Sequence, residues 1–193
     1  MQHTTTESGA LPRTDLTDIQ EPTLLIEFSF IPHSDDLFHR LAASIAWDDR
    51  MKARKTATVG RAYNYSGMTY PDTPMPEDLQ TIITKLRDRL PFAPNNCLLN
   101  LYETGDSSMG FHADSTVGLA PGTGVAIISL GSERAITFRH QKHRSLWFHY
   151  PLPPGSLLYM SDDIQLHWHH AIRPQPDAGP RISLTFRQIA DAA

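Results

Sequence analysis

The 193-residue sequence contains a single cysteine, no long apolar run and no excess of basic over acidic residues. Because Cys97 has no partner in the chain and the polar opening lacks the apolar centre of a signal peptide, we expect a reducing compartment, most simply the cytoplasm. No apolar run approaches the roughly 20 residues that span a bilayer, so we expect no membrane contact. The net charge of −4 argues against nucleic-acid binding by bulk electrostatics and leaves that task to a local basic surface.

The chain length fits one domain with a sizeable core. Residues 1–21 are rich in Thr, Asp and Pro without periodicity, which predicts a mobile tail, so the domain covers 22–193. Residues that favour β-structure over 24–31 predict a strand that ends at a proline. Apolar residues at helical spacing predict a short helix from Asp35 and a longer one over 76–90, and their apolar stripes belong to the core.

Beyond residue 94 the sequence changes to short β-rich runs separated by Gly, Pro and Asp turns. The predicted strands are 97–102, 125–130, 135–139, 146–150, 156–160 and 181–187. This pattern predicts a mainly β fold, a sandwich or barrel of antiparallel strands, with the two N-terminal helices as support. The sequence has no internal repeat and no interdomain linker.

A tripeptide of metal-ligating character, His112-Ala113-Asp114, lies among these runs. The H-x-D pattern alone is weak, since a second copy at His33 precedes a predicted helix and is better explained by helix capping. Residues i and i+2 of a strand point to the same side, so His112 and Asp114 can reach one ion. Two histidines and one carboxylate occupy one face of an octahedral metal, as in non-haem Fe(II) oxygenases. The second histidine would come from the cluster at 167–170, where strand parity does not choose among three histidines.

Two further segments place polar side chains on one face of a strand. Asn100 and Tyr102 are two residues apart, and the closing RISLTFR segment places Arg181 and Arg187 an even number of residues apart. The planar fork of arginine suits bidentate carboxylate binding better than lysine does. On an ideal strand the two arginines lie roughly 20 Å apart at about 3.3 Å per residue, so only long side chains leaning together could share one small ligand. With the metal ligands, these residues predict an iron and 2-oxoglutarate site.

A basic and aromatic stretch, 51–67, lies between the two predicted helices. Its basic residues are Lys52, Arg54, Lys55 and Arg61, and its tyrosines are Tyr63 and Tyr65. Such a mixture suits pairing with phosphates and stacking on an extruded base. A solvated surface hairpin is the alternative that composition leaves open.

In combination these segments resemble the AlkB family of Fe(II)/2-oxoglutarate dioxygenases, which repair alkylated nucleic-acid bases. The matching pieces follow the family's order across roughly half of the chain: Asn100-x-Tyr102, Gly105, His112-x-Asp114, Ser129-Leu130-Gly131, Phe138-Arg139-His140, Pro154-Gly155-Ser156-Leu157-Leu158, His167-Trp168-x-His170 and Arg181-x5-Arg187. The resemblance implies a double-stranded β-helix, or jelly roll, with Fe(II) held by His112, Asp114 and His170. It also implies that 2-oxoglutarate is bound by Asn100, Tyr102, Arg181 and Arg187, with Arg181 and Tyr102 on its distal carboxylate.

The resemblance places a nucleotide-recognition lid at about 51–75, with Tyr65 stacking on the base. The substrate contacts that it implies are Lys55, Tyr65, Ser66, Phe111, Ser115, Arg139 and His140. Two positions depart from the family's pattern. Ser115 follows the H-x-D ligands where many DNA-repair members have acidic residues, and Ser183 stands where an asparagine is frequent. Iron and co-substrate binding are compatible with both changes, whereas the base preference and the roles of His167 and His169 are left open.

The activity that the resemblance implies is oxidative dealkylation of N-alkylated bases in DNA, or in RNA, by a monomer. It consumes 2-oxoglutarate and O2, yields succinate and CO2, and releases a methyl lesion as formaldehyde. A small-molecule hydroxylase of the same fold is the main alternative, and it would have no use for the basic and aromatic lid. A non-catalytic binding module would be expected to lack a metal ligand or an arginine, and this sequence retains them all.

Overall fold

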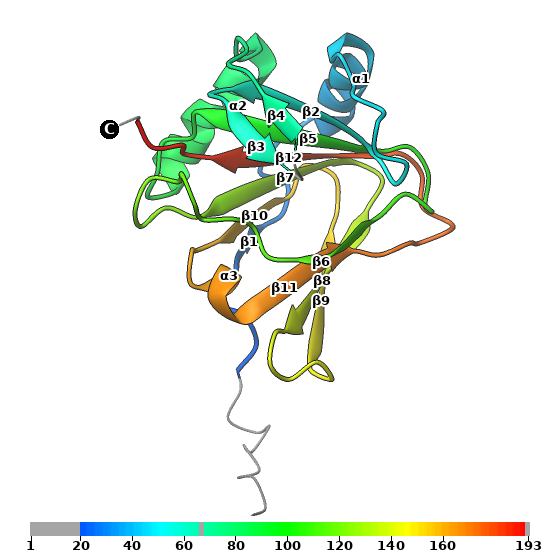
Figure 1. Cartoon of the computed structure of the whole chain (residues 1–193). Coiled ribbons are helices and arrows are strands. Elements are labelled where there is room, and N and C mark those ends of the chain that lie inside the picture. The colour runs from blue at the N-terminus through cyan, green and yellow to red at the C-terminus, as the bar shows by residue number, and fades with distance from the viewer. Residues whose placement is uncertain (1–19, 66–67, 192–193) are drawn as a thin grey trace, which may run out of the picture.

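The computed structural model describes residues 20–65 and 68–191, and it consists mainly of two antiparallel sheets that face each other (Figure 1). The six strands of the larger sheet, in spatial order, are β1 (Leu25–Glu27), β10 (Leu157–Met160), β7 (Val125–Gly131), β12 (Arg181–Arg187), β5 (Asn96–Tyr102) and β2 (Lys55–Gly60). The four strands of the smaller sheet are β6 (Met109–His112), β11 (Trp168–Ile172), β8 (Arg134–His140) and β9 (Trp147–Leu152). The predicted mainly β jelly roll is confirmed.

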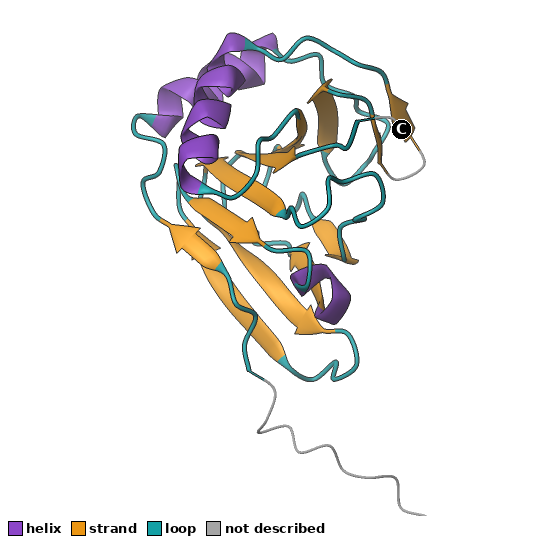
Figure 2. Cartoon of the chain, turned by 90° about the vertical axis from the view of Figure 1, so that its left-hand side faces the viewer, coloured by secondary structure: helices purple, strands orange, loops and turns teal. Residues whose placement is uncertain are grey.

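Two helices cover the outer face of the larger sheet (Figure 2). They are α1 (Ser34–Ser44) and α2 (Glu77–Arg89), so both helix predictions are confirmed. The apolar stripe of α2 is buried against the sheet, as its helical spacing requires. A second core lies between the two sheets, with Ile127 and Leu158 from the larger sheet and Ile136 and Phe138 from the smaller one.

Strand β12 separates the helix-side core from the space between the sheets. Its alternate residues Ile182, Leu184 and Phe186 enter the core beneath the helices. The remaining residues line a pocket between the sheets: Arg181, Ser183, Thr185 and Arg187. Because side chains alternate along a strand, one seven-residue segment contributes both to the core and to one wall of the pocket.

Gly131 ends β7 where the chain leaves the larger sheet and turns back into β8 of the smaller one. It has φ +79°, and a Cβ atom there would lie 2.6 Å from the carbonyl oxygen of Pro180. A residue with a side chain would be both strained and obstructed, so glycine is required at this crossing.

Several elements differ from the sequence-based expectations. Strand β1 covers only Leu25–Glu27 of the predicted 24–31 segment, because the chain turns at Ser29, whose φ is +57°. Strand β2 and the short helix α3 (Ile164–His167) were not predicted, and β6 and β11 were assumed only in the strand-parity argument for the metal ligands, without predicted bounds. Strand β2 falls within the range assigned to the lid, yet it pairs with β5 in the larger sheet.

The rest of the predicted lid contains the hairpin of β3 (Tyr63–Tyr65) and β4 (Met68–Tyr70). Of the predicted tail, residues 1–19 lie outside the described residues. Over the described ranges, every helix is too short or too polar to cross a membrane.

Candidate metal and co-substrate site

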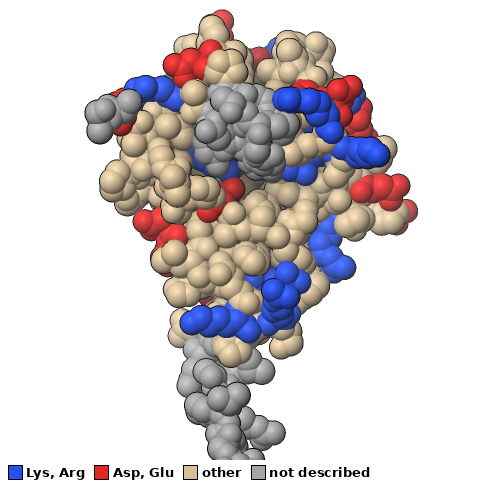
Figure 3. Space-filling view, viewed as in Figure 1, with Lys and Arg blue, Asp and Glu red and all other residues tan. Residues whose placement is uncertain are grey.

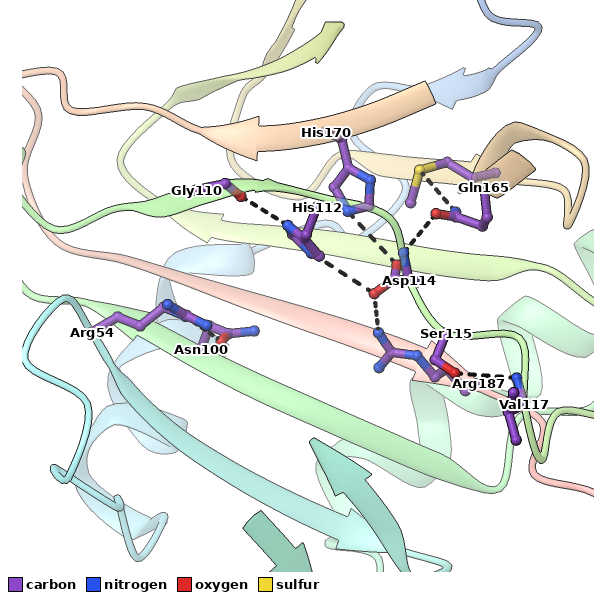
Figure 4. A network of polar contacts seen from close by, with 11 residues as sticks. Arg54, Asn100, Gly110, His112, Asp114, Ser115, Val117, Gln165, His170 and Arg187 are labelled. Atoms are coloured by element: carbon purple, nitrogen blue, oxygen red, sulfur yellow. Dashed lines mark hydrogen bonds and ion pairs between the residues drawn. The ribbon is translucent and has the colours of Figure 1, made fainter. Parts of the chain in front are cut away.

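Three metal-ligating side chains meet at one end of the space between the sheets (Figure 4). His112 is the last residue of β6, and the antiparallel pairing of β6 with β11 sets it opposite His170. The two imidazole rings are 4.3 Å apart between centroids. Asp114 Oδ1 lies 3.9 Å from His112 Nε2, and Asp114 Oδ2 lies 3.7 Å from His170 Nε2. All three ligand atoms lie within 4.8 Å of one another, close enough to share one ion.

Asp114 lies two residues beyond the end of β6, so it is not held by strand pairing as the sequence suggested. Two side chains hold it instead. Arg187 Nη2 donates to Asp114 Oδ1 at 2.7 Å, and the Asp114 backbone N–H donates to Gln165 Oε1 at 2.8 Å. Gln165 is buried and belongs to α3, an element that the sequence patterns did not reveal.

The electrostatic environment keeps the Asp114 carboxylate ionised. Burial alone would raise the pKa of Asp114, but the charge of Arg187, aided by the two histidines, lowers that pKa to about 2. Among the described residues, the buried Oδ2 atom has no hydrogen-bond partner. A buried, ionised oxygen atom that accepts no hydrogen bond is suited to bind a cation, so the site fits an iron ion.

The histidines are also prepared to act as ligands. His112 Nδ1 lies 2.9 Å from the Gly110 carbonyl oxygen, so an N–H on Nδ1 donates there and Nε2 keeps its lone pair towards Asp114. Burial lowers the pKa of His170 to about 4, which keeps this imidazole neutral near pH 7. His167 is exposed at the end of α3 and His169 is half-buried. Within the described ranges, His170 is therefore the member of that cluster that joins the group.

The opposite part of the same pocket is cationic. Arg181 is fully buried, and its Nε donates to Ser129 Oγ at 2.9 Å. Its Cζ lies 5.2 Å from the centroid of the Tyr102 ring, which faces it across the β5–β12 pairing. Both Nη atoms are buried without a hydrogen-bond partner of good geometry among the described residues.

Burial lowers the pKa of Arg181 to about 10, and none of the ion pairs among the described residues includes it. A buried guanidinium with two open donors fits a ligand carboxylate. The predicted co-substrate residues Asn100, Tyr102, Arg181 and Arg187 all line this one pocket together with the three metal-ligating residues. Arg187 also bonds Asp114, so it connects the two halves of the site.

The predicted substrate residues are more dispersed. Phe111 and Arg139 lie together, with the Arg139 Cζ 3.9 Å from the ring centroid of Phe111. Trp147, which sequence reasoning missed, packs edge-on against Phe111 at 5.2 Å, and Arg173 lies 5.2 Å from the Trp147 ring. Exposed basic side chains continue this surface onto the β8–β9 loop, as the blue atoms over the smaller sheet indicate (Figure 3).

The other five predicted contacts either have local partners or lie outside the described residues. Lys55 forms an ion pair with Glu103 at 2.7 Å, and Ser115 Oγ accepts the Val117 N–H at 3.2 Å. His140 packs edge-on against the Trp168 ring at 5.0 Å. The Tyr65 side chain and the whole of Ser66 lie outside the described residues.

A jelly roll that holds two histidines, one carboxylate and a buried arginine in one pocket has the features of a non-haem iron oxygenase. The sequence model of the 2OG-Fe(II) oxygenase superfamily matches residues 24–187. The chain belongs to this superfamily and, within it, to the AlkB family. Family membership makes Fe(II) its metal and 2-oxoglutarate and O2 its co-substrates.

Individual relatives agree with this assignment. The DNA oxidative demethylase ALKBH2 of Homo sapiens is 34% identical over a match that covers 70% of this chain and 56% of the human protein. ALKBH2 of Mus musculus is also 34% identical, with 70% of this chain and 62% of the mouse protein covered. This chain therefore matches little more than half the length of these relatives. The solved structure of OsALKBH1 shares the fold, with a TM-score of 0.62 at 18% identity. The match covers 88% of this chain and 100% of the OsALKBH1 chain.

Proposed function

We propose that this protein removes alkyl groups from N-alkylated bases of DNA by Fe(II)- and 2-oxoglutarate-dependent oxidation. The observation that carries the proposal is a pocket that is lined both by the His112, Asp114 and His170 group and by Arg181, whose Nη donors lack a hydrogen bond of good geometry among the described residues. The names of the human and mouse relatives support DNA as the substrate. In the balanced reaction, one oxygen atom of O2 enters succinate as 2-oxoglutarate loses CO2. The other hydroxylates the alkyl carbon, and a hydroxymethyl group then leaves as formaldehyde.

Each residue of the pocket has a separate task in this proposal. His112, Asp114 and His170 hold Fe(II), which supplies the oxidative chemistry when it is bound. Arg181 and Tyr102 bind the distal carboxylate of 2-oxoglutarate through the guanidinium fork and the phenol. Asn100 and Arg187 lie near its other end, where Arg187 also keeps Asp114 oriented and ionised. The apolar lining, which includes Ile127 and Ile136, excludes water around the reacting groups.

Substrate binding is assigned to the surface beside His112. A base with an alkyl group on its pairing edge must leave the duplex stack before the group can be oxidised. The Phe111, Arg139 and Trp147 cluster offers aromatic faces and a cation for the nucleotide next to that base. The remaining contacts in the proposal are Lys55, Tyr65, Ser66, Ser115 and His140, with the lid at about 51–75. A cytoplasmic monomer with a single domain over 22–193 completes the proposal.

A panel of methylated DNA and RNA oligonucleotides tests the proposal. The Fe(II)-loaded protein is incubated with each oligonucleotide and 2-oxoglutarate, with and without O2, and every base is analysed by mass. We expect one methyl group to be lost from a DNA base for each succinate and formaldehyde formed, and no loss without O2. Methyl loss from RNA alone would make the protein an RNA demethylase. Succinate formation without methyl loss from any base would favour the small-molecule hydroxylase instead.

A further inference from the structure

Arg54 belongs to the basic stretch 51–67 whose charges were expected to meet phosphates, but its side chain is directed inwards. It lies immediately before β2 and is half-buried. Its Nε donates to Asn100 Oδ1 at 2.8 Å (Figure 4). Its Nη1 lies 3.4 Å from the Ser108 carbonyl oxygen. Arg54 is therefore bound to Asn100, a residue of the pocket wall.

The contact with Arg54 determines how the Asn100 amide is turned. A guanidinium carries only donors, so the group that faces it must be the amide oxygen and not the NH2 group. The NH2 group then lies on the other branch of the amide, away from Arg54. Asn100 is 1% exposed and lines the pocket, across the β5–β12 pairing from Ser183. The side of its amide that Arg54 does not occupy is therefore available to a ligand in the pocket.

We propose that Arg54 is a positioning residue for the co-substrate, which acts by fixing the Asn100 amide with its NH2 group available to an oxygen atom of bound 2-oxoglutarate. The inference rests on the proposed function, because it takes 2-oxoglutarate as the ligand of this pocket. Without Arg54 the amide can rotate and present its oxygen, which would repel an anionic ligand.

The backbone around Arg54 restrains the side chain in this inward position. The Ser108 N–H donates to the Ala53 carbonyl oxygen at 3.1 Å, directly before β6, which ends at His112. At its other side, β2 pairs with β5 in the register that sets Thr56 opposite Asn100. Both neighbours of Arg54 are therefore tied to segments that build the site, and the side chain bridges the space between them.

A double-mutant cycle tests the inference through binding and not through turnover. Fe(II)-loaded protein is titrated with 2-oxoglutarate in the absence of O2, using wild type, Arg54→Met, Asn100→Ala and the double variant. We expect Arg54→Met to weaken binding roughly three- to tenfold, the effect of about one hydrogen bond. In the Asn100→Ala background the same change should cost nothing further, because Arg54 acts through Asn100. An equal loss in both backgrounds, or no loss in either, would overturn the proposal.

Matched variants separate this role from a phosphate contact. Arg54→Lys retains a donor and a charge and should recover part of the lost affinity, whereas Arg50→Met removes an exposed arginine four residues earlier and should leave 2-oxoglutarate affinity unchanged. The contrary result is that Arg54→Met leaves 2-oxoglutarate affinity intact and reduces the slope of log K for oligonucleotide binding against log salt concentration by about 0.9, the value for one phosphate. Arg54 would then be a phosphate contact, and the inference would fail. If the cycle behaves as expected while no oligonucleotide loses a methyl group, the inference stands and the dealkylation proposal fails.

Discussion

Replacing Arg181 by methionine should abolish tight 2-oxoglutarate binding and yet leave the ligand-free fold at least as stable as before. Arg181 is fully buried, has no acidic partner among the described residues and leaves two Nη atoms without a good hydrogen bond. Exchange of a buried, incompletely paired charge for an apolar side chain of similar volume is commonly neutral or stabilising. The guanidinium is therefore expected to be retained for binding and not for folding.

The magnitude follows from the two open donors. Each hydrogen bond to a charged group is worth about 1.5–3 kcal/mol, so the loss of both should cost about 3–6 kcal/mol, or roughly a hundredfold to ten-thousandfold in affinity. Arg181→Lys keeps the charge but loses the planar fork, and one lost bond predicts a weakening of roughly ten- to a hundredfold. The contact of Arg181 Nε with Ser129 Oγ adds little to the folding cost, because Ser129 Oγ also donates to the Leu152 carbonyl oxygen.

Two measurements on the metal-loaded protein without O2 check this reasoning. Equilibrium titration gives the 2-oxoglutarate affinity, and denaturant unfolding with and without the ligand gives its stabilising effect. At a hundred times the wild-type Kd the ligand should add about 2.7 kcal/mol to the wild type and almost nothing to Arg181→Met. Arg87→Met, an exposed change on α2, serves as the control. Wild-type affinity in Arg181→Met, or a loss of several kcal/mol of ligand-free stability, would refute the reasoning.

Three further results are expected. Alanine at His112, Asp114 or His170 should remove both iron binding and turnover without unfolding the protein, whereas His169→Ala should still bind iron. The test is the metal content of each variant after anaerobic loading, and a normal iron content in His170→Ala would show that His170 is not a ligand. The free energy of unfolding of the metal-free protein should fall by on the order of 3 kcal/mol as pH falls from 6.5 to about 4, because His170 takes up a proton at higher pH in the unfolded chain than in the folded one. Unfolding measured at each pH should show a smaller loss in His170→Gln. Arg139→Gln should lower the salt slope of oligonucleotide binding by about 0.9, and an unchanged slope would remove Arg139 from the phosphate-binding surface.

Local patterns were sufficient for the elements that bury one clear face. The apolar stripe of α2 repeats every three to four residues, and the run in β12 is rich in β-forming residues, so both were predictable within one residue of their ends. Strand β2 was not recognised, because its basic and threonine-rich sequence resembles an exposed hairpin. Its residues are buried only by pairing with β5 and by the core beside it. Burial of that kind is a property of the neighbours and not of the segment.

The sequence by itself determined which residue types were available for the chemistry and which of them share a face of a strand. The even spacing of Asn100 and Tyr102 places this pair on one face of its strand, and the even spacing of Arg181 and Arg187 does the same for theirs, because side chains alternate along any strand. The H-x-D tripeptide supplied two candidate metal ligands, although Asp114 lies beyond the strand on which that reasoning relied. These inferences need no knowledge of what lies across the sheet.

Only the tertiary structure decided how those residues are held and which distant residues join them. The register of β6 against β11 selects His170 from its cluster, and Arg187 and Gln165 orient an Asp114 that lies beyond the strand. Arg54 is turned towards Asn100, 46 positions away in the chain. Each of these contacts joins segments far apart in sequence, so its existence depends on strand register and sheet packing, which no local periodicity encodes.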